Sequence, residues 1–469
     1  MDQLNPLDAS FIDVEDEDRH ASMAIAMIAI FEGPPPSYDD FLAFVDGRLP
    51  LAPRHRQKLR TVPFRLGPPV WVEDAGFDLR YHVRETAVPA PGSDSELAAL
   101  MARVMAQRLD RDYPLWEGWL VTGLAQDRWA LISKVHHCMV DGVSGTDMYR
   151  LFFDFTPDPA PPVVDDRIVP AEPSGFELAA RAALDAVLLP VREAAALRSA
   201  LARPGHIVRQ ASDVVRALAK LAATARPATG SSLSGPIGQQ RRYALARASL
   251  DDIKAIKGEL GGTVNDVVLA AITSGFRALL LARGEQPGRH TVPSMVPVSV
   301  RVGGEVTSYE NRVSALLAEL PVHIADPAER LAAITQQLAA LKASKEAPAG
   351  ETLVSLGRYT LFPVASLAVR LAFRFPQSEI VTVTTNVPGP RQPLYGMGRR
   401  LVEMIPYVPI ATTLRTGVSI VSYCDNVAFG ITGDYDTNPD LLVLARGIEN
   451  GVAELLPPAP AVSPGSARP

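Results

Sequence analysis

The chain has 469 residues, of which 47% are hydrophobic and 21% are charged, and its formal net charge is -6. This length exceeds what one hydrophobic core usually supports, so we expect two large domains. The acidic balance argues against nucleic acid as the main partner, because proteins that bind phosphate backbones usually carry a basic surplus. Two cysteines, Cys138 and Cys424, offer neither a disulfide framework nor a metal site, which indicates reduced thiols in a cytoplasmic protein.

The first part of the chain predicts strands and no membrane anchor. Residues 1–20 are acidic and lack the apolar core of a secretion signal. No run of about 18 apolar residues is present, so we expect no membrane-spanning helix, and any membrane contact should be peripheral. Residues 23–31 are wholly apolar and predict a buried strand, whereas residues 77–84 alternate like a half-buried strand. A short turn should pair two further strands, at 118–124 and 129–135.

The strand predicted at 129–135 ends at His136-His137, and a turn with Asp141-Gly142 then opens a helix. Adjacent residues of a strand point to opposite faces, so at most one of the two imidazoles can face a given cleft. Such an imidazole is a candidate general base, because its ordinary pKa lies near neutral pH. Asp141 could cap the helix or form a buried pair with an arginine, and Gly142 would permit an unusual φ. Either histidine alone is more often a packed or solvated residue than a catalyst.

Three segments each allow two interpretations. Residues 173–226, which follow a proline-rich exit from the first domain, are rich in helix formers. They predict either a helical crossover between the domains, which we favour, or helices whose apolar face lies in a lipid interface. The basic cluster at 53–58 indicates a solvated turn rather than an anion contact. Residues 353–375 are apolar and should pack in the core, although they could also line a tunnel or touch a membrane.

The second domain should begin near residue 236. Thr263 followed by Asp266 fits a capping box for a helix that continues to Ala282. Asn265 and Asp266 can therefore be explained as structural residues of the first helical turn. The alternative is that they bind substrate. The β-prone run at 381–390 places Thr384 and Thr385 where they can donate hydrogen bonds.

The pattern HHxxxDG is far more specific as a unit than either histidine alone. It resembles the active-site motif of the CoA-dependent acyltransferase superfamily. Further stretches resemble one family within it, the bacterial wax ester synthase/diacylglycerol acyltransferases: PLDASF, FDLRYHVR, PLWE, KVHHCMVDGVSG, GPIG followed by RR, TVNDVVLA, PVSVR and TNVPGP. They run in family order from Pro6 to about Pro390. Two positions depart from the usual pattern, since Ser234 replaces an asparagine and Thr385 replaces a serine.

The resemblance implies a mixed α/β fold of two chloramphenicol-acetyltransferase-like domains, each a mixed sheet flanked by helices, with a tunnel between them. The expected division is an N-terminal domain at 1–160, a helical crossover at 161–235, a C-terminal domain at 236–456 and a disordered tail at 457–469. Acyl-CoA would enter the tunnel from one side and diacylglycerol or a fatty alcohol from the other, with no cofactor and no metal. The product would be triacylglycerol or wax ester, made in the cytoplasm with peripheral association to a membrane or lipid inclusion.

The resemblance also implies roles within the HHxxxDG motif. His137 would be the general base, and His136 and Gly142 would complete the motif. Asp141 would act mainly in support, and we suggest a buried pair with Arg301. No acyl-enzyme is expected, because no Ser or Cys is paired with a base in the sequence. Donors to the tetrahedral oxyanion would come from Thr384, Thr385 or Asn386.

Two alternatives remain open at this stage. One is an acyltransferase of the same superfamily with another alcohol or an acyl-carrier donor. The other is a catalytically silent lipid-binding protein, against which the intact HHxxxDG argues.

Overall fold

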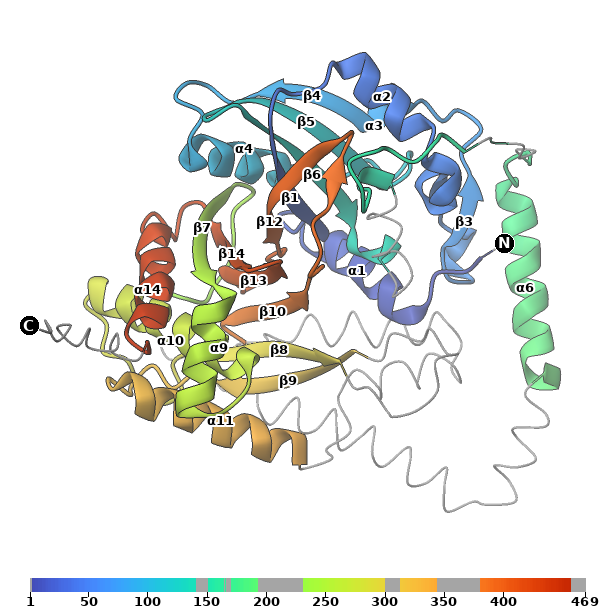
Figure 1. The fold of residues 1–469 in the computed structure, drawn as a ribbon. Coiled ribbons are helices and arrows are strands. Elements are labelled where there is room, and N and C mark those ends of the chain that lie inside the picture. The colour runs from blue at the N-terminus through green and yellow to red at the C-terminus, as the bar shows by residue number, and fades with distance from the viewer. Residues whose placement is uncertain are drawn as a thin grey trace, which may run out of the picture.

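The computed structural model describes residues 2–140, 151–163, 165, 170–192, 231–299, 313–343 and 380–456. Several of the residues named above lie outside this described part of the chain: Asp141, Gly142, Arg301, residues 193–226, residues 353–375 and the tail. The described residues form two six-stranded sheets with helices packed on them (Figure 1). The expected mixed α/β fold with two sheet-containing domains is therefore confirmed.

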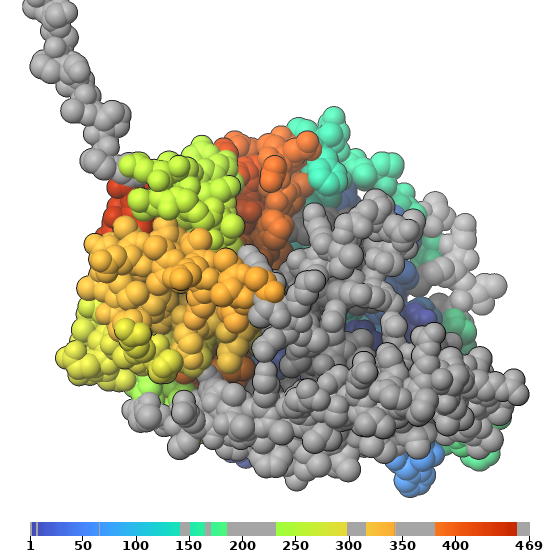
Figure 2. Space-filling view, turned by 90° about the horizontal axis from the view of Figure 1, so that it is seen from below, coloured from blue at the N-terminus to red at the C-terminus, as the bar shows by residue number. Residues whose placement is uncertain are grey.

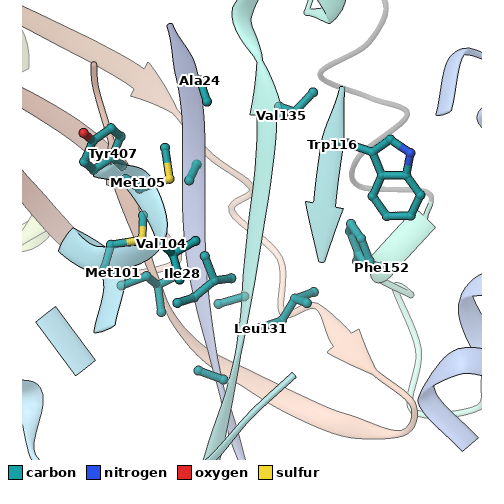
Figure 3. Packing of buried hydrophobic residues seen from close by; sticks show 14 of the residues in the cluster. Ala24, Ile28, Met101, Val104, Met105, Trp116, Leu131, Val135, Phe152 and Tyr407 are labelled. Atoms are coloured by element: carbon teal, nitrogen blue, oxygen red, sulfur yellow. The ribbon is translucent and has the colours of Figure 1, made fainter. Parts of the chain in front are cut away.

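The first sheet takes most of its strands from the N-terminal part of the chain. In the order β11-β12-β1-β6-β5-β4, these are Tyr395–Gly396, Arg399–Tyr407, Ala24–Glu32, Arg128–His136, Trp116–Leu124 and Val83–Ala87. Helix α4 (Asp94–Ala106) packs on it, with Met101, Val104 and Met105 near Ile28 of β1 (Figure 3). The apolar segment at 23–31 thus becomes an inner strand, which pairs antiparallel with both β6 and β12.

The second sheet belongs to the C-terminal part of the chain. In the order β7-β14-β13-β10-β8-β9, its strands are Arg241–Ser249, Asn426–Asp434, Thr416–Tyr423, Thr382–Pro388, Pro293–Ser299 and Val313–Glu319. Its helices are α9 (Leu250–Leu260), α10 (Val264–Ala282), α11 (Pro327–Ala343) and α14 (Leu441–Ala453). From below, α11 and its neighbours form much of this domain's surface (Figure 2).

Helix α10 is the central helix of the second domain. The predicted capping box is present, because Thr263 Oγ1 accepts from Asp266 N–H and Asp266 Oδ2 accepts from Thr263 N–H. By length and hydropathy alone α10 could cross a membrane, so the expectation that no apolar stretch is long enough is wrong for this helix. Its 18-residue apolar window is 72% buried within the fold, as in the core helix of a globular domain.

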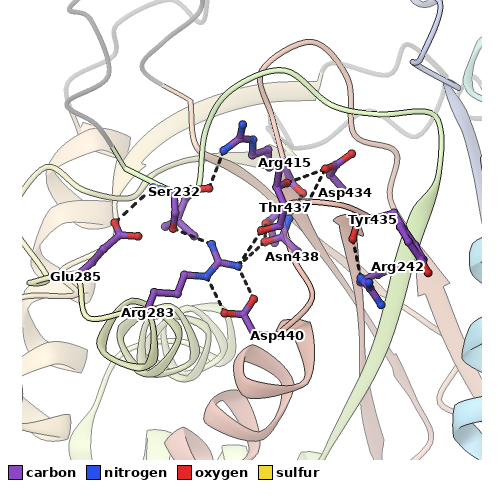
Figure 4. Close-up of polar contacts among 12 residues, drawn as sticks. Ser232, Arg242, Arg283, Glu285, Arg415, Asp434, Tyr435, Thr437, Asn438 and Asp440 are labelled. Atoms are coloured by element: carbon purple, nitrogen blue, oxygen red, sulfur yellow. Dashed lines mark hydrogen bonds and ion pairs between the residues drawn. The ribbon is translucent and has the colours of Figure 1, made fainter.

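A polar network joins the two ends of the second domain (Figure 4). Arg283, which follows α10, donates to both carboxylate oxygens of Asp440 at 2.8 and 2.5 Å. The same guanidinium donates to Ser232 Oγ at 2.7 Å and to Asn438 Oδ1 at 3.0 Å. Because Ser232 stands before the first strand of this domain and Asp440 before its last helix, one arginine holds both segments at the end of α10.

Strand β12 connects the two sheets. It pairs with β1 in the first sheet, although it comes from the C-terminal part of the chain. The carbonyl of Pro406 in β12 accepts from Tyr243 Oη at 2.5 Å and from Ser419 Oγ at 2.9 Å, both in the second sheet. Gly430 of β14 permits this approach, since a Cβ at that position would overlap the Pro406 carbonyl oxygen. The expected division at residues 160 and 236 stays a prediction, and the first sheet draws on both parts of the chain.

The remaining elements surround the first sheet: α1 (Pro6–Glu17), α2 (Tyr38–Asp46), β2 (Gln57–Arg60), β3 (Val70–Glu73), α3 (Leu79–His82) and α6 (Gly175–Arg192). The half-buried strand expected at 77–84 is wrong in its first part. Asp78 accepts a hydrogen bond from Arg80 N–H and so begins the helical turn α3. The strand therefore starts only at Val83.

We predict that Gly430→Ala lowers the free energy of unfolding by at least about 2 kcal/mol, because the added methyl group overlaps the backbone of β12. Gly258→Ala in α9 is the matched control, since nothing lies near its Cβ position and alanine favours a helix by about 0.5–1 kcal/mol. Urea denaturation of both variants measures the difference. Equal midpoints for Gly430→Ala and the wild type would contradict the role given to this contact.

Candidate active site

The two histidines of the motif lie where β6 ends between two neighbouring segments. His136 N–H donates to the carbonyl of Leu115 at 2.9 Å, just before β5. His137 N–H donates to the carbonyl of Met23 at 2.9 Å, just before β1. His137 then begins the 3-10 turn η4 (His137–Met139). Both neighbours of β6 thus fix the backbone of the motif.

His136 is a buried residue whose ring contacts protein groups on both sides. Its Nδ1 accepts from Cys138 N–H at 3.2 Å, so a neutral ring carries its proton on Nε2. Nε2 lies 3.3 Å from Oε1 of Glu15, and Nδ1 also lies 2.9 Å from the Cys138 sulfur. With both nitrogens directed at neighbours, His136 holds the motif in place.

Glu15, near the end of α1, is the buried carboxylate that faces His136. It accepts from Met23 N–H at 2.7 Å and from the guanidinium of Arg111 at 3.0 Å. Burial alone would raise the pKa of Glu15, but the contacts with His136, Met23 N–H and Arg111 lower it to about 2. This charged carboxylate joins α1, the start of β1 and the end of β6. No local sequence pattern marks Glu15, because the contact with His136 spans about 120 residues.

Phe11, also on α1, covers the ring of His137. The two rings stack with centroids 3.9 Å apart and planes inclined by 25°. His137 is half-buried, and its Nδ1 has no hydrogen-bond partner within the described part of the chain. Burial, together with the neighbouring His136, lowers the pKa of His137 to about 4. At neutral pH the imidazole is therefore uncharged and able to accept a proton.

Trp116 of the PLWE stretch anchors the start of β5, beside the carbonyl that holds His136. Its Nε1–H donates to the carbonyl of His55 at 2.7 Å. The ring of His82 stacks on it with centroids 4.8 Å apart, and His82 Nδ1 lies 2.9 Å from the Trp116 carbonyl. The aromatic residue that the sequence showed only as an anchor before a strand thus supports the backbone next to the motif.

The predicted substrate-binding residues do not form one cluster, and their environments differ. Asp266 is buried and completes the capping box, which matches the structural interpretation given above. Asn265 Oδ1 accepts from Asn386 Nδ2 at 3.1 Å, so these two residues do meet. Thr384 is buried, and its hydroxyl pairs with that of Ser294 at 2.9 Å.

Strand register separates the three β10 candidates. Thr384 and Asn386 pair with Val418 and Ile420 of β13, which belong to the core packed against α10. Thr385 pairs with Ser419, whose hydroxyl reaches Pro406 of β12. Because paired residues share a face of the sheet, only Thr385 looks toward the first sheet.

A cleft of about 720 Å³ opens where β8 and β10 diverge. These strands pair only at Thr382 and Val383, and they separate beyond that point. Residues of β8, β10 and the start of α10 line the cleft, among them Pro297, Asn386 and Asn265. Arg391 and Lys254 add positive charge to the lining, and Asp425 adds a negative charge. The structure thus places two predicted substrate residues in one cavity.

The basic side chains of the cluster at 53–58 form ion pairs with acidic neighbours. Arg54 pairs with Asp2 at 2.9 Å, and Lys58 lies 3.2 Å from Asp74. Arg56 pairs with Asp165. The prediction of a solvated turn is therefore only partly right, because the 3-10 turn η2 (Pro53–Arg56) leads directly into β2 and these side chains are partly buried against carboxylates. Within the described residues, no group of three His, Cys, Asp or Glu side chains could hold a metal ion.

We predict that Phe11→Ala raises the pKa of His137 from about 4 toward 6.5, because water then reaches the ring and solvates its charged form. Titration of the histidine ring signals by NMR, with His137→Gln to assign the peak, measures the shift. Phe11→Leu keeps an apolar cover and should move the pKa less. An unchanged pKa in Phe11→Ala would show that the phenyl ring does not exclude water.

Known proteins are similar to this chain over most of its length. The chain matches the wax ester synthase/diacylglycerol acyltransferase catalytic domain over residues 4–268 and the C-terminal domain of the same enzymes over residues 309–456. A Mycobacterium tuberculosis protein described as "Probable diacylglycerol O-acyltransferase tgs1" is 40% identical over 461 residues, which cover 97% of this chain and 96% of that protein.

Two solved structures share the fold. The wax ester synthase/diacylglycerol acyltransferase from Marinobacter aquaeolei VT8 has a TM-score of 0.69 and 27% identity, covering 97% of this chain and 98% of that one. The first condensation domain of the calcium-dependent antibiotic synthetase has a TM-score of 0.57 at 15% identity, over 97% of each chain, which concerns the fold alone. The chain therefore belongs to the wax ester synthase/diacylglycerol acyltransferase family and is an acyltransferase.

Proposed function

We propose that this acyltransferase moves a long-chain acyl group from acyl-CoA to the hydroxyl of diacylglycerol, a long-chain alcohol or both. The products are triacylglycerol and wax ester. The observation that carries the proposal is His137, an uncharged and half-buried imidazole under Phe11 whose Nδ1 has no partner in the described residues. An imidazole that is uncharged at neutral pH can accept the proton of a bound hydroxyl. The family membership of the chain supplies the reaction class.

In the proposed mechanism, His137 takes the proton of the acceptor hydroxyl. The oxygen attacks the thioester carbonyl carbon, and the tetrahedral intermediate collapses with cleavage of the carbon–sulfur bond. The CoA thiolate leaves and receives the proton from the imidazolium. Cys138 does not act as a nucleophile, since burial raises the pKa of its thiol well above the ordinary value. The proposed transfer is therefore direct, without an acyl-enzyme on Cys138.

Thr385 is the proposed donor to the oxyanion. Of the three candidates on β10, it is the one on the sheet face that looks toward the first sheet, which carries His137 at the end of β6. A hydroxyl at this position keeps the donor that the usual serine would supply. Thr384 instead keeps β8 and β10 together through Ser294, and Asn386 lines the cleft.

The cleft of about 720 Å³ is the proposed site of the CoA portion of the donor. Asn265 and Asn386 offer amide groups to the amides of the pantetheine arm, and Arg391 offers positive charge to the phosphates, whereas Lys254 is paired with Asp251 at 2.9 Å. Since β8 and β10 separate here, a narrow arm can pass between them toward Thr385. We place the reaction in the cytoplasm, with the protein held peripherally at a lipid surface that supplies the acceptor.

Replacement of the proposed base provides the first test. We predict that His137→Ala lowers CoA thiol release from a long-chain acyl-CoA by about 10²- to 10⁴-fold, because proton transfer loses its acceptor. Release is measured separately with diacylglycerol and with a long-chain alcohol. The control is His290→Ala, which removes a histidine exposed to solvent.

Three outcomes of this assay argue against the proposal. Equal release by His137→Ala and the wild type removes the role of His137. Release that does not depend on the acceptor indicates a hydrolase. Lipid binding with no release from any long-chain acyl-CoA favours a lipid-binding protein.

A second prediction separates the two threonines of β10. Thr385→Val should lower kcat by about 10²- to 10³-fold with little change in stability, because it removes the oxyanion donor. Thr384→Val should instead cost about 1–3 kcal/mol of stability, because the buried Ser294 hydroxyl loses its partner. Steady-state kinetics and urea denaturation of both variants give the comparison. Full turnover in Thr385→Val would place the donor elsewhere.

A further inference from the structure

Helix α6 presents one apolar face to the fold and another to solvent. On the inner face, Leu178 packs with Val70 and Val72 of β3, and Ala182 lies against Gly67. On the outer face, Phe176 is 83% exposed and Leu184 is 57% exposed. These two positions, together with the exposed Ala180 and Ala183, follow the spacing of one helical stripe. Figure 1 shows α6 at the periphery of the molecule, beside β3.

The loop before β3 adds a second apolar group to this surface. Its 3-10 turn η3 (Pro63–Arg65) runs along α6, since Pro63 lies next to Gly175. Phe64 in this turn is 92% exposed, and Leu66 is 43% exposed. Phe64 has a φ of 55°, a left-handed conformation that is costly for a bulky side chain. Phe64 thus combines a strained backbone conformation with a phenyl ring that is almost wholly exposed.

The charges around this surface do not select an anionic partner. Lys58 lies 3.2 Å from both Asp74 and Glu172, and Arg60 lies 2.7 Å from Glu172. On α6 itself, Arg181 stands near Glu177 and lowers the pKa of that carboxyl, after the larger effect of the Ser174 cap. Each of these cations is thus compensated by an acidic neighbour. Attraction to this surface must come from its apolar groups.

We propose that Phe64, Leu66, Phe176 and Leu184, which we call the α6 patch, insert into the surface of a neutral, zwitterionic lipid layer that contains diacylglycerol. The proposal deepens the proposed function and depends on it, because an acceptor that is insoluble in water must be taken from a lipid phase. Two projecting phenyl rings and a peripheral amphipathic helix are suited to the region between headgroups and acyl chains. The paired cations imply that anionic lipid is not required.

The test is co-sedimentation of the full chain with phosphatidylcholine vesicles that contain diacylglycerol. We expect Phe64→Ser with Phe176→Ser to weaken vesicle binding by about 100-fold, or about tenfold for each phenyl ring removed from the lipid. Phe155→Ser is the matched control, since Phe155 is 72% exposed but follows Asp154, which pairs with Tyr395 of β11. This control should bind as the wild type does, and added phosphatidylglycerol should not strengthen binding.

A water-soluble short-chain alcohol as acceptor separates this inference from the proposed function. The double variant should release CoA thiol from acyl-CoA with this acceptor at the wild-type rate. Wild-type vesicle binding by the double variant overturns the α6 patch, and so does binding that requires phosphatidylglycerol. A change from dimer to monomer in the double variant, seen by light scattering, also overturns it, because a second copy of the chain would then be the occupant. Failure of thiol release in the wild type would refute the proposed function, whereas vesicle binding reports on the patch by itself.

Discussion

The carbonyl oxygen of Pro406 is the contact through which β12 joins the two sheets. It accepts from Tyr243 and Ser419 of the second sheet, while its own strand pairs with β1 of the first. Since β1 also pairs with β6, only one strand separates β12 from the strand that leads to the histidines. The face of β10 that carries Thr385 is connected to the same contact through Ser419. A residue of the second sheet can therefore be positioned relative to His137 through backbone pairing and one buried carbonyl.

His136 and His137 are adjacent histidines, but their different surroundings give them different properties. His136 has polar neighbours, because its Nδ1 accepts from Cys138 N–H and its Nε2 lies 3.3 Å from Oε1 of Glu15. His137 is covered by a phenyl ring that offers no hydrogen bond, and its pKa falls to about 4. Glu15 and Phe11 both belong to α1, so one helix supplies the partner of the first histidine and the cover of the second. Arg111 compensates the buried charge that this arrangement requires.

The parts of the site that sequence could predict are those determined locally. The capping box at Thr263, the strand that ends at His136 and the burial of β1 follow from residue spacing alone. The contacts of Glu15 with His136 and of Phe11 with His137 could not be derived, because more than 100 residues separate the partners and no local pattern marks them. The same reason hides the placement of β12 in the first sheet. Thr384 and Thr385 looked equivalent until the register with β13 assigned them to opposite faces. The α3 turn was mistaken for a strand because one Asp78 hydrogen bond outweighed the alternation.

The divergence of β8 and β10 shows how the fold can make room for a ligand within a sheet. Strands that stop pairing leave backbone donors and acceptors without their ladder, which costs free energy unless side chains or water replace it. Thr384 is the first residue of β10 after the last pair with β8, and its hydroxyl forms a hydrogen bond with that of Ser294. Two residues later, Asn386 bonds across to Asn265 on α10 instead of to β8. The opening thus starts at a buried polar pair and widens into a cleft lined by amide groups. An opening stabilised in this way can persist without ligand, and a polar, narrow substrate arm can enter it with little rearrangement of the sheet.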